Sequence, residues 1–141
     1  MTAVEAGTTT VAEIEVVEAF LRALEDLDID AAVALLHPDV TYQNVPLPPA
    51  RGRDATTKQL RLLSKYCTGF RAITHSIAAN GTTVLTERTD VIEIRRFKPA
   101  FWVCGRFEVE DGLIRSWKDY FDYADCAVAA LKAAVKALLG R

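Results

Sequence analysis

The stretch TTVLTERTDVIEI at residues 82–94 combines the pattern of a half-buried strand with two charged residues at its centre. Side chains alternate between the faces of a strand, so one face carries Val84, Thr86, Arg88, Asp90, Ile92 and Ile94. This face is apolar at both ends and charged in the middle. An ion on a core-facing surface is costly unless it is paired, so we interpret Arg88 and Asp90 as part of a functional site.

Two other segments also place polar groups among large apolar ones. In LIRSWKDYF, at residues 113–121, alternation puts on one face Leu113, Arg115, Trp117, Asp119 and Phe121. The segment 40–45 places Tyr42 and Asn44 beside Val40. If the three faces line one cavity, they supply two carboxylates, a guanidinium, a phenol and an amide.

The remaining pattern predicts a single α+β domain at residues 10–141, after a flexible arm at residues 1–9. Asn80-Gly81 and Asp111-Gly112 are typical of tight turns and predict two hairpins. The sequence predicts a curved, mostly antiparallel sheet with helices packed in its concavity, which forms a cone with a deep pocket. The expected helices are 10–27, 31–36, 55–66 and 125–139, and the expected strands are 40–45, 71–79, 82–95, 101–110 and 113–121, with a loop at 46–52.

Composition excludes several kinds of partner. The net charge is −2, from 17 Lys+Arg and 19 Asp+Glu, which gives no reason to expect nucleic acid or an anionic membrane. No apolar run approaches the roughly 20 residues that span a bilayer, and the first residues do not resemble a secretory signal. The three cysteines are widely spaced and show no metal-ligand pattern, so we expect a cytoplasmic protein with reduced thiols and no metal.

Two carboxylates joined by one arginine suit general acid–base chemistry, because their environments can hold them in different protonation states. Each residue also has a plainer interpretation. Arg88 and Asp90 can form a structural ion pair, Asp119 can belong to a turn, and Tyr42 and Asn44 can be edge-strand residues. The plainer interpretations require a coincidence on three separate strands, so we favour the catalytic one. For His37 and His75 we expect structural roles, the latter near the core.

The segments YQNVP (42–46), ERTD (87–90) and WKDYF (117–121) resemble, in this order, the limonene-1,2-epoxide hydrolase family of the NTF2-like (SnoaL-like) superfamily. The resemblance covers most of the chain from about residue 11 to 125. It implies that Asp119 is the base that deprotonates water, that Asp90 is the acid that protonates the epoxide oxygen, and that Arg88 bridges the two. It also implies that Tyr42 and Asn44 position the water.

The family resemblance further implies a homodimer, no cofactor, and an apolar epoxide related to limonene oxide or cyclohexene oxide as substrate. From face counting, the expected pocket walls are Leu35, Leu36, Ile73, Val84, Trp117 and Phe121. Two other functions remain open at this point. One is an isomerase or cyclase of the wider superfamily, and the other is a non-catalytic cone that carries a small hydrophobic ligand.

Overall fold

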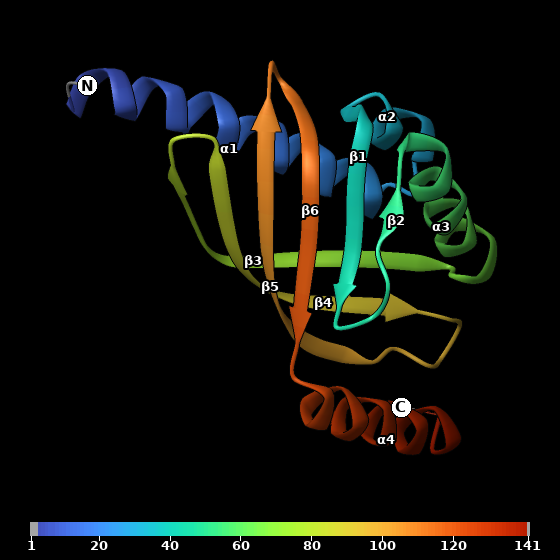
Figure 1. Ribbon diagram of the computed structural model, residues 1–141. Coiled ribbons are helices and arrows are strands. Elements are labelled where there is room, and N and C mark those ends of the chain that lie inside the picture. The colour runs from blue at the N-terminus through green and yellow to red at the C-terminus, as the bar shows by residue number, and fades with distance from the viewer. Residues whose placement is uncertain (1–2, 141) are drawn as a thin grey trace.

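The computed structural model describes residues 3–140, with side chains from Val11 onward. It contains one six-stranded sheet and four helices, which confirms the predicted α+β class (Figure 1). The elements are α1 (Ala3–Glu25), α2 (Ile29–Val33), β1 (Leu36–Val45), β2 (Ala50–Arg51), α3 (Arg53–Tyr66), β3 (Gly69–Asn80), β4 (Thr83–Glu93), β5 (Ala100–Glu110), β6 (Leu113–Phe121) and α4 (Tyr123–Leu138).

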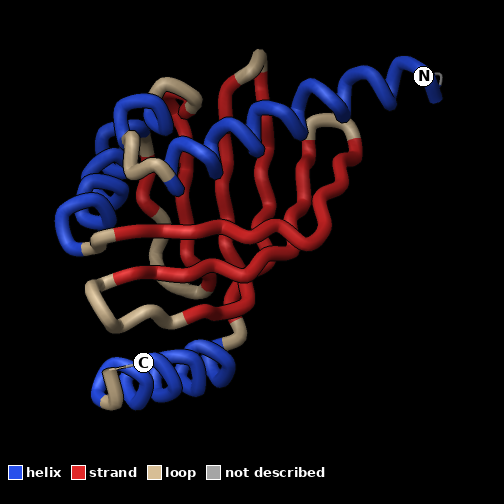
Figure 2. Tube along the Cα trace, turned by 180° about the vertical axis from the view of Figure 1, so that it is seen from behind, coloured by secondary structure: helices blue, strands red, loops and turns tan. Residues whose placement is uncertain are grey.

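The sheet has the strand order β2-β1-β6-β5-β4-β3. All neighbouring strands are antiparallel except β1 and β6, which run parallel. The sheet curls strongly, and α1 crosses its hollow while α3 lies beside β1 (Figures 1 and 2). Curl and helices together leave the inner faces of β1, β4 and β6 directed at one enclosed space.

Several element boundaries differ from the sequence prediction. α1 begins at Ala3, so helix replaces most of the stretch predicted as a loose arm, whereas Met1 and Thr2 lie outside the described residues. α3 begins at Arg53 and not at residue 55, after Gly52, whose φ of 89° suits glycine. The predicted loop at 46–52 contains the short strand β2, which pairs with Thr41 and Tyr42 of β1.

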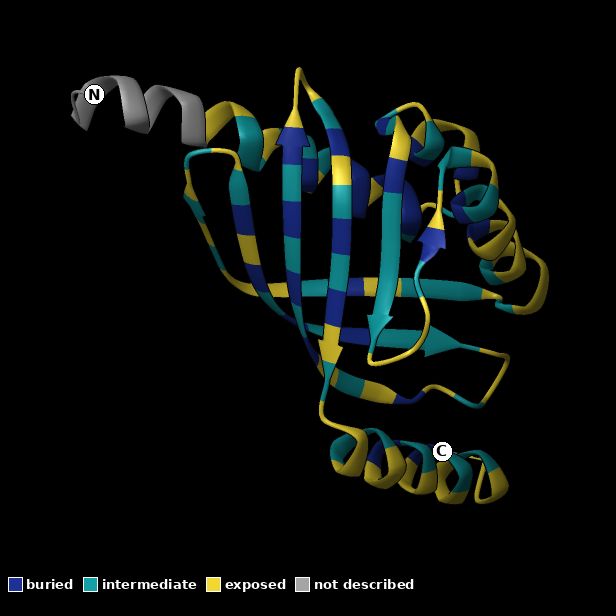
Figure 3. Cartoon of the chain, in the orientation of Figure 1, coloured by how far each residue is buried: buried dark blue, intermediate teal, exposed yellow. Residues whose placement is uncertain are grey.

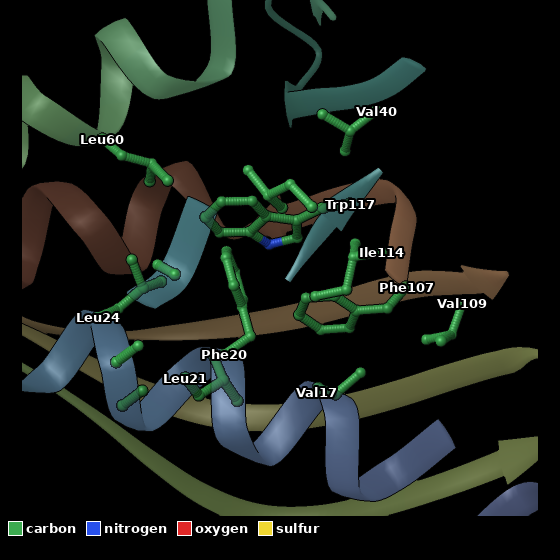
Figure 4. Close-up of a cluster of buried hydrophobic side chains, with 14 of the residues drawn as sticks. Val17, Phe20, Leu21, Leu24, Val40, Leu60, Phe107, Val109, Ile114 and Trp117 are labelled. Atoms are coloured by element: carbon green, nitrogen blue, oxygen red, sulfur yellow. The ribbon is translucent and has the colours of Figure 1, made fainter. Parts of the chain in front are cut away.

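The core lies between α1 and the inner face of the sheet. Phe20 reaches from α1 to Trp117 of β6 in an edge-to-face contact, with ring centroids 4.9 Å apart (Figure 4). It also meets Phe107 of β5 at 6.5 Å. Such aromatic contacts add to the stability gained from burial alone. The aromatic cluster therefore fixes the inner face of β6 against α1.

The last helix contributes little to the core. Only Ala129 and Ala133 of α4 are buried, whereas Val128, Leu131 and Val135 are exposed (Figure 3). The helix lies outside the hollow of the sheet, where it contacts β5. In the part of the chain that the structure describes, none of the helices combines the length and apolar character that crossing a bilayer requires.

Replacing Phe20 by alanine tests the packing of α1 on the sheet. We expect the free energy of unfolding to fall by about 3–5 kcal/mol, because the change removes a fully buried ring and leaves a cavity. Chemical denaturation measures this loss. Val11→Ala, at an exposed position of the same helix, should change the value by less than about 0.5 kcal/mol. Similar losses in the two variants would contradict the packing described.

Candidate active site

Arg88 lies in the wall of the enclosed space and contacts both candidate acids. Its Nε and Nη2 donate to the two carboxylate oxygens of Asp90, at 3.0 and 2.9 Å. Nη2 also donates to Oδ2 of Asp119, at 3.2 Å. All three side chains are buried, with 1%, 5% and 4% of the residue surface exposed for Arg88, Asp90 and Asp119. The structure thus brings together the three charged residues singled out from the sequence.

Burial and charge act in opposite directions on this cluster. Burial alone would lower the pKa of Arg88, but the negative charges of Asp119 and Asp90 outweigh it and raise the pKa above its usual value. Burial raises the pKa of Asp119, an effect that the attraction of Arg88 opposes and the charge of Asp90 reinforces. Arg88 therefore stays charged, while the Asp119 carboxylate is a stronger base than an ordinary aspartate.

Aromatic groups hold Asp119 and the polar residues of β1 in place. The indole Nε1 of Trp117 donates to Oδ1 of Asp119 at 3.0 Å, and the Trp117 ring stacks on Tyr42 with centroids 3.9 Å apart. The Tyr42 hydroxyl donates to Oδ1 of Asn44 at 3.1 Å. Burial raises the pKa of Tyr42, and the charge of Asp119 adds to this, so the phenol stays a neutral donor. In the parallel pairing of β1 and β6, Asn44 lies opposite Asp119.

These groups line a cavity of about 530 Å³. Arg88, Asp90, Asp119, Tyr42 and Asn44 all contribute to its surface. Helices supply much of the remaining wall, with Leu21 and Leu24 from α1 and Gln59, Leu60, Leu62 and Leu63 from α3; strands add Phe70, Ile92, Phe101, Trp117 and Phe121. A mostly apolar wall with a few convergent polar groups is typical of a small-molecule site.

Only two of the six predicted wall residues, Trp117 and Phe121, line this cavity. Leu36 and Val84 are fully buried in the core, and Leu35 packs against the same core from its edge. Leu36 and Val84 thus belong to the core and not to the cavity wall, and Leu35 is only partly buried. Face counting alone identifies inward side chains but not their depth, which explains the error.

Strand irregularities account for the remaining differences. The pairing of β3 with β4 shifts register between Thr74 and Ser76, where β3 contains one extra residue. Odd-numbered side chains therefore lie on one face of the sheet before the shift and on the opposite face after it. Ala72 is buried, whereas Ile73 does not reach the cavity, and His75 is exposed, with its ring bonded to the Thr89 hydroxyl. The prediction that His75 lies near the core is therefore wrong.

A similar shift affects β6. The pairing of β5 with β6 slips between Glu108 and Val109, so Ile114 is buried and Arg115 is exposed, where it pairs with Glu110 at 3.1 Å. Arg115 consequently does not share the face of Trp117 and Asp119. After the shift the alternation holds, so Trp117 and Asp119 face inward as the sequence predicted.

A second hollow, of about 730 Å³, lies away from the buried acids. Its acidic lining includes Glu13, Asp39, Glu108, Glu110 and Asp111. Although it is larger, it lacks a buried acid–base pair and an apolar wall. We therefore assign the candidate active site to the cavity around Arg88.

Known proteins are similar to this chain in sequence and in fold. Residues 11–132 match the limonene-1,2-epoxide hydrolase catalytic domain. "Epoxide hydrolase EphG" of Mycobacterium tuberculosis is 44% identical over 119 residues, which cover 84% of this chain and 79% of that protein. A solved LEH-like epoxide hydrolase of M. tuberculosis is 42% identical, with a TM-score of 0.88 and coverage of 94% and 98% of the two chains.

A more distant match concerns the fold only. An NTF2-like protein of unknown function from Cytophaga hutchinsonii has a TM-score of 0.67 at 20% identity, over 79% of this chain and 91% of its own. This match shows that the chain has an NTF2-like fold. Within it, the chain belongs to the limonene-1,2-epoxide hydrolase family, as its family match and its 44% identical relative show. The class of enzyme predicted from the sequence is confirmed at the level of this family.

The two acids should differ in their effect on stability. Asp90→Asn removes the carboxylate that receives two of the bonds from Arg88, so we expect a loss of about 3 kcal/mol in the free energy of unfolding. Asp119→Asn should lose less, because burial disfavours the charge that it removes. Denaturation at neutral pH measures both. An equal or larger loss for Asp119→Asn would contradict the view that Asp90 is the main partner of Arg88.

The difference in stability between Asp119→Asn and the parent should depend on pH in a definite direction. Because the folded-state pKa of Asp119 is raised, its contribution to stability is present below the unfolded-state pKa and is lost as the pH rises through the folded-state pKa. The stability of Asp119→Asn relative to the parent should therefore improve as the pH rises through this window. A relative stability that does not change with pH would show that the pKa is not raised.

Proposed function

We propose that the protein hydrolyses an epoxide to a vicinal diol in one step. Water held by Tyr42, Asn44 and Asp119 attacks an epoxide carbon. As the new carbon–oxygen bond forms, Asp119 takes a proton from the water, the epoxide carbon–oxygen bond breaks, and Asp90 protonates the released oxygen. Return of the proton from Asp119 to Asp90 completes the cycle.

The observation that carries the proposal is the bridge of Arg88 between two buried carboxylates in one cavity. One guanidinium and two carboxylates carry one excess negative charge, and binding one proton neutralises the group. A buried cluster favours this neutral state because an unbalanced charge is costly there. The cluster can therefore contain an acid and a base at the same time.

The position of β1 supports the choice of Asp119 as the base. Asn44 lies opposite Asp119 in the sheet, and the charge of Asp119 acts on Tyr42 more strongly than that of Asp90. The proposed water-binding pair is therefore next to Asp119. Once it is ionised, the Asp119 carboxylate is a stronger base than an ordinary aspartate, because burial raises its pKa.

The cavity supports an apolar substrate of modest size. Apart from the polar residues of the proposed mechanism and Gln59, its wall is formed by leucine, isoleucine and aromatic side chains. Its volume of about 530 Å³ lies within the range of small-molecule sites. We propose an epoxide related to limonene oxide or cyclohexene oxide, as the family name suggests.

We also propose a homodimer. The surface of α4 exposes Val128, Leu131, Val135 and Leu138, with 67% of Leu131 exposed. Contiguous apolar groups of this kind mark association surfaces. Light scattering on purified protein measures the mass directly, and a monomer at micromolar concentration would contradict this proposal.

Replacing either acid should remove activity without removing the fold. We expect Asp90→Asn and Asp119→Asn each to lower kcat by at least roughly 100-fold, because each deletes one proton transfer. Diol formation from cyclohexene oxide measures the loss, and circular dichroism establishes that each variant is folded. Glu110→Gln, on the surface, is the matched control. Turnover close to that of the parent in either variant would refute the assigned role.

Labelled water distinguishes the one-step route from one through an ester. In ¹⁸O water, a single turnover should place the label in the diol, because the attacking oxygen comes from solvent. A first-turnover product with unlabelled oxygen at the attacked carbon would show transfer from a carboxylate instead. Absence of any diol from limonene oxide and cyclohexene oxide would favour an isomerase, a cyclase or a ligand-binding cone.

A further inference from the structure

The edge of the Arg88 guanidinium that faces away from the acids also makes a hydrogen bond. Its Nη1 donates to the hydroxyl oxygen of Thr86 at 3.1 Å. Thr86 lies two residues before Arg88 on the same inner face of β4 and is buried, with 3% of its surface exposed. The hydroxyl does not line the cavity, so Thr86 is separate from the residues that surround the substrate.

Gly105 of β5 provides the space for this contact. It lies opposite Thr86 in β4 and opposite Asp119 in β6, so it is the residue between the two strands that carry the charged cluster. A Cβ atom at this position would lie 2.5 Å from Nη1 of Arg88, 2.7 Å from the Thr86 hydroxyl oxygen and 3.0 Å from the Phe107 ring. Its backbone is not in the left-handed region, so the need for glycine is one of space.

The rigidity of the guanidinium links this contact to the acids. The group is planar, so the direction of Nη1 also fixes that of Nη2 and Nε. Nη2 is the atom that binds both carboxylates. A buried N–H without an acceptor is unfavourable, so a guanidinium that lost the Thr86 bond would tilt toward other acceptors. The carboxylates of Asp90 and Asp119 are acceptors that the guanidinium already contacts.

We propose that Thr86 and Gly105 are positioning residues for the reaction. Thr86 fixes the plane of the Arg88 guanidinium through a hydrogen bond, and Gly105 leaves the space in which the two groups meet. Together they set how Arg88 is shared between Asp90 and Asp119, and thereby which carboxyl holds the proton. This inference rests on the proposed function for its kinetic consequences, but the placement of Arg88 is a property of the protein alone.

The pair Thr86→Val and Thr86→Ser tests the hydrogen bond with little change in volume. Thr86→Val should lower kcat roughly 10- to 100-fold with little change in KM, because small displacements of reacting groups slow the chemical step. It should also shift the acid limb of the pH–rate profile. Thr86→Ser keeps the hydroxyl and should restore both properties. Thr89→Val, on the outer face of the same strand, is the matched control.

A second measurement does not depend on turnover. Titration of the Asp119 carboxyl carbon by ¹³C NMR should give a changed pKa in Thr86→Val and a parent-like pKa in Thr86→Ser. If the parent hydrolyses no epoxide, the proposed function fails and this titration still tests the placement of Arg88. Parent-like titration and kcat in Thr86→Val, or equal defects in the valine and serine variants, would overturn the inference.

Gly105→Ala tests the space requirement. We expect a loss of kcat similar to that of Thr86→Val, because the methyl group displaces Nη1. Gly69→Ala is the control, since its Cβ would meet only the flexible side chain of Glu93. Full activity in Gly105→Ala would overturn the role of the glycine. If Gly105→Ala does not fold, the comparison of valine and serine at position 86 decides the proposal.

Discussion

The pairing of Arg88 with Asp90 and Asp119 is the constraint on which the inner face of the sheet depends. A guanidinium buried to this extent requires acceptors for its N–H groups, and the fold supplies them from two strands. The surrounding sequence reflects this requirement. Gly105 is small because the guanidinium edge passes over it, and Thr86 is polar although it is buried.

The aromatic cluster joins the core to this charged centre. Phe20 of α1 packs on Trp117, whose ring stacks on Tyr42 and whose indole N–H binds Asp119. One side chain thus takes part in core packing on one edge and in the electrostatics of the cavity on the other. Because protein interiors are close-packed, a change in the packing around Trp117 is expected to move the Asp119 carboxylate as well.

Sequence alone predicted the fold class and the charged residues, since regular alternation held along β4 and in the second half of β6. It failed where a strand gains a residue, as in β3 before Ile77 and in β6 near Arg115, because a bulge inverts the parity on which the prediction rests. The cavity residues that α3 supplies, such as Leu60, could not be predicted from the sequence of that helix alone. Which face of a helix meets a distant sheet is decided by tertiary packing.

The parallel pairing of β1 with β6 joins the two strands that lie farthest apart in the chain among those that line the cavity. Asn44 and Asp119 lie 75 residues apart in a chain of 141, so no half of the polypeptide contains both residues of the proposed water-binding corner. Contacts of such long sequence separation close large loops, which slows folding in comparison with local hairpins. The proposed water-binding corner therefore forms only when β1 and β6 pair, and a nascent chain lacks it until its sixth strand has been synthesised.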